Sequence, residues 1–136
     1  MATGIYVNLP VKDLKRTIEF WEKLDFKFNP DFTDDNATCM IITNDSYVMF
    51  LKEPFFKDFI GKKTISDSKT STEAIVCFSV ESRQRVEDLI NTALKNGAAP
   101  SNKPQDYGWM YSWGFQDPDG HLWEVVFMDE AAIPKE

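Results

Sequence analysis

A sharp turn of the chain is predicted by the stretch Phe115-Gln116-Asp117-Pro118-Asp119-Gly120-His121-Leu122-Trp123-Glu124. Pro118 presets the backbone angle of a type I turn, and the Asp117 side chain can accept hydrogen bonds from the turn amides. Gly120 can adopt the left-handed conformation that closes a three-residue hairpin loop. The stretch therefore predicts a β-hairpin whose second strand carries Glu124.

Glu124 lies among apolar residues of that second strand. Side chains alternate along a strand, so Leu122 and Val126 share its face. Burying an unpaired carboxylate in apolar surroundings costs folding free energy, so either Glu124 has a hydrogen-bonding partner or its face of the strand is exposed to solvent. Glu124 is thus the first candidate for a functional residue.

The first strand of the hairpin is expected over residues 107–116, where aromatic residues alternate with small or polar ones. A three-residue loop pairs Asp117 with His121 and sets Gly114 opposite Glu124, so the aromatic row packs against helices. The residues expected to line the Glu124 side are then Met110, Ser112 and Gly114. A two-residue loop would reverse this and surround Glu124 with Trp113 and Tyr111. The Pro-Asp-Gly sequence favours the first register.

Two halves of the chain show the same order of elements. Residues 5–11 alternate as a strand, and a helical pattern follows the N-cap candidate Asp13. Residues 74–80 are again strand-like, and a second helical stripe follows the N-cap candidate Ser82. A turn and strand over 44–51 parallel the hairpin at 117–124. The chain is therefore predicted to contain a repeat of pattern, not of identity.

The segment between the halves, Lys52 to Thr72, resembles a connector with one short helical turn. Its apolar side contains Phe55, Phe56, Phe59 and Ile60. Such an exposed aromatic side would serve as a lid or as a dimer contact.

Composition limits the function classes. The 136 residues are 43% hydrophobic and 14% aromatic, which is typical of a globular chain with a core. The net charge of -7 disfavours nucleic acid or an anionic membrane as partner and is compatible with a cationic ligand. Cys39 and Cys77 have no metal-site spacing and are interpreted as buried reduced thiols. No export or membrane segment is evident, so a cytoplasmic location is expected.

Three motifs together resemble the vicinal oxygen chelate superfamily of glyoxalases, bleomycin resistance proteins and extradiol dioxygenases. They are Asn8–Leu14 (NLPVKDL), Phe20–Leu24 (FWEKL) and Asp117–Glu124 (DPDGHLWE). The resemblance implies an α+β fold in which two βαβββ repeats form a single curved-sheet cavity, often within a homodimer. It implies one domain over 1–136, with units at about 4–52 and 73–128, a crossover at 53–72 and a tail at 129–136.

The sequence departs from this family at the expected metal ligands. In metal-binding relatives the ligands come from equivalent strand positions, which correspond here to Tyr6, Met49, Ile75 and Glu124. Methionine and isoleucine offer no oxygen or nitrogen side-chain donor to a hard divalent ion, so no standard metal site is expected. A shifted alignment that recruits Asn8 or Glu73 is the alternative.

The cavity residues expected around Glu124 are Tyr6, Asn8, Met49, Ile75, Cys77, Met110, Ser112 and Gly114. Each also has a purely structural interpretation. Glu124 is either functional or a buried acid hydrogen-bonded to Tyr6, Ser112 or Asn8. Cys77 is either a lining residue or packing, and His121 is interpreted as a hairpin pairing residue.

Three functions remain open from the sequence. The first is a metal-independent protein that binds a small molecule between apolar walls and Glu124, with no cofactor. The second is a glyoxalase-like lyase or dioxygenase-like enzyme with a divalent metal ion. The third is a metal-free enzyme in which Glu124 is a general base. Whether the protein is an enzyme is left open.

Overall fold

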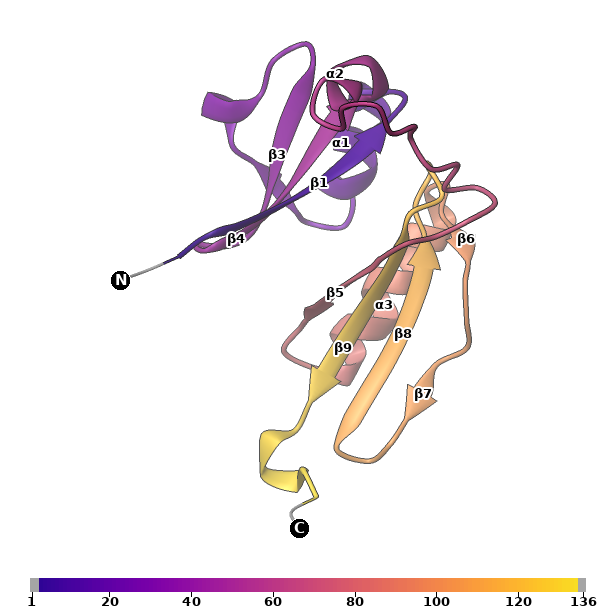
Figure 1. Cartoon of the computed structure of the whole chain (residues 1–136). Coiled ribbons are helices and arrows are strands. Elements are labelled where there is room, and N and C mark those ends of the chain that lie inside the picture. The colour runs from indigo at the N-terminus through magenta and orange to yellow at the C-terminus, as the bar shows by residue number, and fades with distance from the viewer. Residues whose placement is uncertain (1–2, 135–136) are drawn as a thin grey trace. The chain divides into compact units, whose positions relative to one another are not determined.

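The computed structural model describes residues 3–134, which form two compact units that divide between Ser66 and Asp67 (Figure 1). The division falls inside the expected crossover 53–72. That the two units act as one domain remains a prediction, and the last two residues of the expected tail lie outside the described part. Each unit consists of a sheet with one long helix on it.

The first unit has a sheet of strand order β1-β4-β3-β2, in which only β1 and β4 are parallel. Its elements are β1 (Ile5–Val11), α1 (Leu14–Glu22), β2 (Lys27–Phe28), the 3-10 turn Pro30–Phe32, β3 (Ala37–Thr43), β4 (Ser46–Lys52) and α2 (Glu53–Lys57). The short helix predicted in the connector is confirmed by α2.

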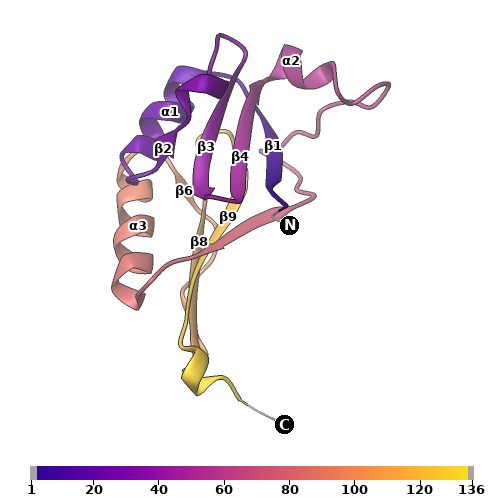
Figure 2. The same cartoon turned by 90° about the vertical axis from the view of Figure 1, so that its left-hand side faces the viewer.

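Helix α1 covers one face of the first sheet (Figure 2). It begins after Asp13, whose carboxylate accepts a hydrogen bond from the Arg16 amide at 3.1 Å. Its apolar side is buried, and the Trp21 ring lies 6.2 Å from the Phe50 ring of β4. The predicted N-cap and helical stripe are thus confirmed.

The second unit has a sheet of order β5-β9-β8-β6, and β7 pairs with the same edge of β8 as β6, farther along that strand. Its elements are β5 (Ile75–Ser79), α3 (Arg83–Lys95), β6 (Ala99–Pro100), β7 (Gln105–Asp106), β8 (Met110–Gln116), β9 (Leu122–Met128) and the 3-10 turn Glu130–Ala132. The strand-then-helix order of the first unit recurs, including the parallel pairing of its first and last strands. The α+β class and the repeat are therefore confirmed.

Helix α3 packs on one face of the second sheet. It begins after Ser82, whose hydroxyl accepts from the Arg85 amide at 3.0 Å, and Gly97 ends it with a φ of +105°. The buried side chains of this layer are Val86, Leu89, Ile90 and Ala93 from α3 and Phe78, Tyr111, Phe115, Trp123 and Val125 from the sheet. The aromatic row of β8 faces the helix, as the three-residue loop predicted.

The hairpin turn has the predicted geometry. The Asp117 amide donates to the His121 carbonyl at 2.9 Å, the Gly120 amide donates to the Asp117 carbonyl at 2.8 Å, and Gly120 has a φ of +92°. The Asp117 carboxylate is buried and accepts from the amides of Asp119 and His121 and from the Trp123 indole, at 2.9, 3.0 and 2.9 Å. Asp117 therefore joins the turn to the core beneath it.

The strand expected over 107–116 is shorter than predicted and begins at Met110. Gly108, with a φ of +82°, forms a turn between β7 and β8, and the Tyr107 amide donates to the Met110 carbonyl across it. Tyr107 and Trp109 therefore belong to a turn and not to the aromatic row, because a left-handed glycine interrupts the extended backbone.

Candidate functional site

Glu124 lies on the side of the second sheet opposite α3, which we call the Glu124 face. Its members, as the strand registers set them, are Ile75, Cys77, Ser79, Met110, Ser112, Gly114, Gln116, Leu122, Glu124, Val126 and Met128. Gly114 on β8 and Cys77 on β5 are the cross-strand neighbours of Glu124. The predicted register, with Gly114 opposite Glu124, is confirmed.

One side-chain oxygen of Glu124 is held by Asn102, a residue of the segment between β6 and β7. The Asn102 amide donates to Oε1 of Glu124 at 2.5 Å, and its own side-chain oxygen accepts from the Gly114 backbone amide at 3.1 Å. The Asn102 carbonyl accepts from the Trp113 indole at 3.2 Å. Asn102 is therefore fixed at three atoms and orients the carboxylate.

Gly114 leaves the space into which Glu124 folds. A Cβ atom at Gly114 would lie 2.6 Å from the Trp123 carbonyl oxygen, 2.9 Å from Cδ of Glu124 and 3.0 Å from its Oε1. The Glu124 carboxyl group thus lies directly over the glycine. From the sequence, the small Gly114 was expected to leave free space above Glu124. The Glu124 side chain itself fills that space.

The second oxygen of Glu124 has no donor. Within residues 3–134, Oε2 of Glu124 is buried and accepts no hydrogen bond. Buried polar atoms are nearly always hydrogen-bonded, and an unpaired one costs about 1–3 kcal/mol. An acceptor of this kind is expected where a ligand or water supplies the missing donor.

Among the described strand residues of the Glu124 face, the neighbours of Glu124 carry no charged side chain. Its neighbours along and across the strands are Ile75, Cys77, Ser79, Ser112, Gly114, Gln116, Leu122 and Val126. Desolvation, followed by the negative charge of Glu124, raises the pKa of the Cys77 thiol, which therefore stays protonated near neutral pH. Cys77 is poorly suited to act as a nucleophile.

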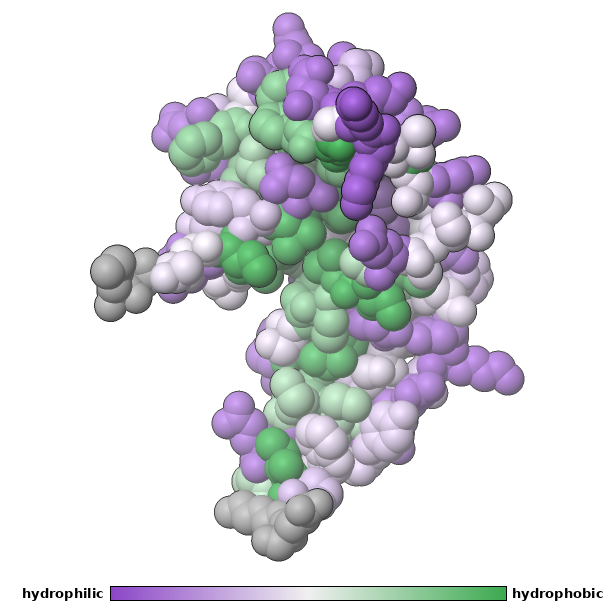
Figure 3. Space-filling model, viewed as in Figure 1, coloured by the Kyte–Doolittle hydropathy of each residue, from purple (hydrophilic) through white to green (hydrophobic). Residues whose placement is uncertain are grey.

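The outer part of this face is apolar. Ile75 and Met128 are 57% and 40% exposed. Figure 3 shows hydrophobic side chains along the part of the second unit that covers β9 and β8. Cys77 was expected to be buried, but it is exposed, because the face of β5 that carries it is turned away from α3.

The candidate residues of the first unit lie on its sheet face opposite α1. Asn8 is the cross-strand neighbour of Met49, and the exposed Tyr6 stacks on Tyr47 with ring centroids 4.8 Å apart. The Asn8 amide donates to the Tyr6 carbonyl at 3.0 Å. The site residues expected in the second unit lie on the Glu124 face. Those expected in the first unit lie on the face of the first sheet opposite α1.

Asn102 is the residue that sequence reasoning missed. The donor to Glu124 lies outside the three residues that the sequence suggested. One feature of the sequence does point to it: Pro100 and Pro104 flank the segment, and proline cannot donate to a strand ladder. The backbone amide of Gly114, on the edge of β8, consequently has no strand partner there. It donates to the side chain of Asn102 instead.

The residues at the equivalent strand positions do not fit a divalent metal ion. Met49 and Ile75 stand at positions equivalent to Glu124 and Tyr6 without an oxygen or nitrogen side-chain donor, so Glu124 is the one carboxylate among these four described residues. In the described residues, no group of three or more His, Cys, Asp and Glu side chains is placed to hold a metal ion. The exposed Glu73 precedes β5 and is not part of the Glu124 face.

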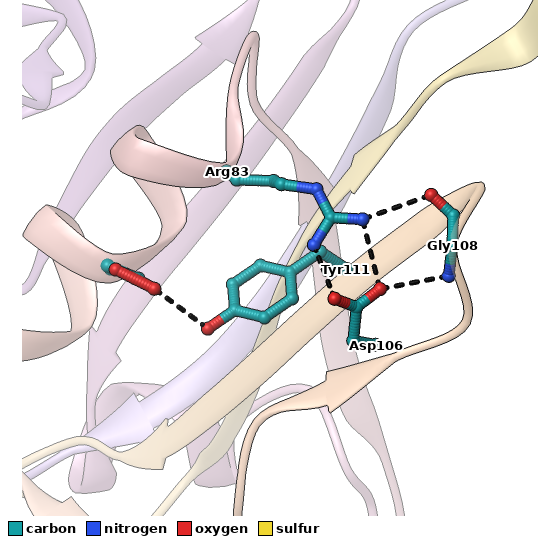
Figure 4. Close-up of polar contacts among 5 residues, drawn as sticks. Arg83, Asp106, Gly108 and Tyr111 are labelled. Carbon is teal, nitrogen blue, oxygen red and sulfur yellow. Dashed lines mark hydrogen bonds and ion pairs between the residues drawn. The ribbon is translucent and has the colours of Figure 1, made fainter.

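A second polar cluster joins α3 to the turn between β7 and β8 (Figure 4). The Arg83 guanidinium donates to both oxygens of Asp106 at 2.6 and 2.9 Å and to the Gly108 carbonyl at 3.0 Å. Hydrogen bonds from Arg83 and from the Gly108 amide lower the pKa of Asp106 to about 2. Arg83 also lies over the Tyr111 ring at 5.2 Å. Because its groups are mutually paired, this cluster is interpreted as a structural clamp.

No helix within residues 3–134 combines the length and apolarity needed to cross a membrane.

Comparison with solved structures shows the same fold in proteins of low sequence identity. A hypothetical protein from S. aureus has a TM-score of 0.77 at 23% identity, over 93% of this chain and 95% of its own. A glyoxalase/bleomycin resistance protein/dioxygenase family enzyme from Burkholderia phytofirmans PsJN gives 0.74 at 16%, over 90% and 96%. The fosfomycin resistance protein of Mesorhizobium loti gives 0.66 at 17%, over 96% and 97%.

The family is shown by the sequence itself. None of the curated proteins matches the chain significantly. The model of the Glyoxalase/Bleomycin resistance protein/Dioxygenase superfamily matches residues 5–125, nearly the whole chain. The chain therefore belongs to the glyoxalase/bleomycin resistance protein/dioxygenase superfamily.

Proposed function

We propose that this protein binds a small organic molecule on the Glu124 face without a metal ion. The observation that carries the proposal is the buried, unpaired Oε2 of Glu124 on a face that is otherwise uncharged. A ligand that donates a hydrogen bond to this oxygen and covers the apolar residues around it would relieve the unpaired acceptor and bury apolar surface. We further propose that it acts in the cytoplasm as a homodimer.

The orientation of Glu124 supports a binding role over a merely structural one. A buried structural acid normally has donors at both oxygens, as the Asp117 carboxylate does. Glu124 has one donor, the Asn102 amide, which binds Oε1 and leaves Oε2 on the other side of the carboxylate without a donor. Such a carboxylate is half satisfied before ligand arrives, which is the arrangement of a preorganised acceptor.

The chemistry of the donor set argues against the metalloenzymes of this superfamily. A Lewis-acid mechanism needs several oxygen or nitrogen ligands at one ion, and Met49 and Ile75 supply none. Resistance proteins occur among the similar structures, including a bleomycin resistance determinant encoded on the transposon Tn5. Sequestration of a small molecule is therefore the activity we assign.

The test is a thermal-shift screen of chelator-treated protein against methylglyoxal-glutathione adducts, catechols and cationic antibiotics. A true ligand raises the melting temperature of the native protein, because it binds only the folded state. Glu124→Gln should lose that shift, while Glu130→Gln, in the exposed turn after β9, should keep it. A metal content of one ion per untreated chain, with ligand binding only when that ion is present, would overturn the proposal.

A further inference from the structure

The two oxygens of Glu124 are not equivalent. Oε1 accepts from Asn102 at 2.5 Å, whereas Oε2 is buried and accepts nothing among the described residues. Asn102 cannot swing away freely, because it also accepts from the Gly114 amide and, through its carbonyl, from the Trp113 indole. The face therefore offers a ligand one oxygen that has no hydrogen bond, whereas at Oε1 a ligand would have to share the oxygen with Asn102.

A single confined acceptor distinguishes between kinds of cationic donor. A guanidinium group is planar and binds a carboxylate best through two parallel hydrogen bonds, one to each oxygen. An ammonium group is compact and needs only one oxygen. Because Oε1 is engaged and Oε2 is enclosed, the arrangement favours the compact donor.

The neighbours of Glu124 suit a cation with an apolar body. Among the described strand residues of the Glu124 face, no basic side chain competes for the carboxylate, and Leu122 and Val126, which flank Glu124 on the same face of β9, are aliphatic. Ile75 and Met128 extend this apolar surface to the exposed part of the face. A hydrophobic amine would satisfy both the charge and the apolar surface.

We infer that the ligands of the Glu124 face are hydrophobic primary amines, and that Asn102 is a specificity-determining residue that selects them over guanidines by occupying Oε1. This inference rests on the proposed function and narrows it to one ligand class. Asn102 acts through Glu124: it is a positioning residue and not a group that contacts the ligand.

The experiment compares 2-phenylethylamine, 2-phenylethylguanidine and 2-phenylethanol on the full, chelator-treated chain. Calorimetry gives each affinity, and the side-chain amide resonance of Asn102 in nitrogen-edited NMR spectra locates the binding. The amine should bind at least about tenfold more tightly than the alcohol, the factor expected of a charge-assisted hydrogen bond. The amine should also bind more tightly than the guanidine and shift the Asn102 resonance.

Asn102→Ala tests the selection itself. Removing the amide frees Oε1, so the preference for amine over guanidine should shrink or reverse, whereas general damage would weaken both probes alike. Asn96→Ala is the matched control, since Asn96 caps α3 by donating to the Thr92 carbonyl and should leave the preference unchanged. The preference of the native protein does not depend on how well any variant folds.

The inference is overturned if the guanidine binds native protein as tightly as the amine, if neither binds, or if Asn102→Ala weakens both equally. Its failure is separable from that of the proposed function. Suppose that a screen ligand without an amino group binds metal-free native protein but not Glu124→Gln. That result would contradict the assignment to amines and leave the proposed function standing. Ligand binding that needs a bound metal ion sinks the proposed function.

Discussion

Gly114→Ala is the perturbation whose cost follows most directly from the structure. The new methyl group would lie 2.6 Å from the Trp123 carbonyl oxygen and 2.9 Å from Cδ of Glu124. The first contact is with backbone of the adjacent strand, which cannot yield without distorting the ladder. The second is with the side chain that we assign to ligand binding.

Two opposing terms set the magnitude. Overpacking of this kind costs about 1–3 kcal/mol. Replacing glycine by alanine in a strand returns about 0.5–1 kcal/mol, because the unfolded chain loses conformational freedom. At the midpoints of these two ranges the net loss is about 1 kcal/mol, which corresponds to a fall in melting temperature of roughly 3–5 °C for a chain of this size.

The assay is urea unfolding followed by tryptophan fluorescence, with Gly4→Ala as control. A Cβ at Gly4 would make only ordinary contacts, the nearest at 3.6 Å, so that variant should be as stable as the native protein. In a Glu124→Ala background, the cost of Gly114→Ala should fall but not vanish, since the Trp123 contact remains. A Gly114→Ala protein as stable as the native one would refute the close packing of Glu124 over Gly114.

Three further outcomes are expected. Asp117→Asn should cost about 1–3 kcal/mol in urea unfolding, because in either orientation its NH2 group would face a donor, the Trp123 indole or the amides of Asp119 and His121; unchanged stability would contradict these bonds. The stabilisation of Asp106 by Arg83 should persist above the ordinary carboxyl range and disappear as pH falls through about 2. The Asp106 carboxyl resonance should therefore titrate at a higher pKa in Arg83→Gln, with the Gly108 amide still lowering it; a titration unchanged from that of the native protein would count against the clamp. Asn102→Asp should be less stable than Asn102→Ala at neutral pH by about 1 kcal/mol, because two like charges then meet; equal stabilities would argue against the contact.

Local chemistry in the sequence predicted the fold well where short-range rules apply. The Pro-Asp-Gly turn set the hairpin register, and with it the face of Glu124, because one residue more or less in the loop would reverse every side chain. The N-cap residues Asp13 and Ser82 correctly predicted where α1 and α3 begin. The strand before the hairpin was predicted too long, because alternation continues through Gly108 while the backbone turns there.

The partner of Glu124 was beyond the reach of the same rules. Asn102 lies 22 residues before Glu124 and meets it only because β6 and β7 leave the intervening segment along the edge of β8. Alternation and repeat alignment describe residues on strands, and Asn102 lies on none. The lack of oxygen and nitrogen side-chain donors at Met49 and Ile75 is visible in the sequence, whereas the unequal pairing of the two Glu124 oxygens depends on a tertiary contact.

The most direct test of the proposed function is calorimetric titration of chelator-treated protein with the best ligand of the screen, repeated on Glu124→Gln. The native protein should bind one ligand per chain, Glu124→Gln should bind it at least about tenfold more weakly, and added divalent ions should change neither value. Binding that Glu124→Gln retains in full, or that appears only after one divalent ion per chain is added, would contradict a metal-independent site built on Glu124.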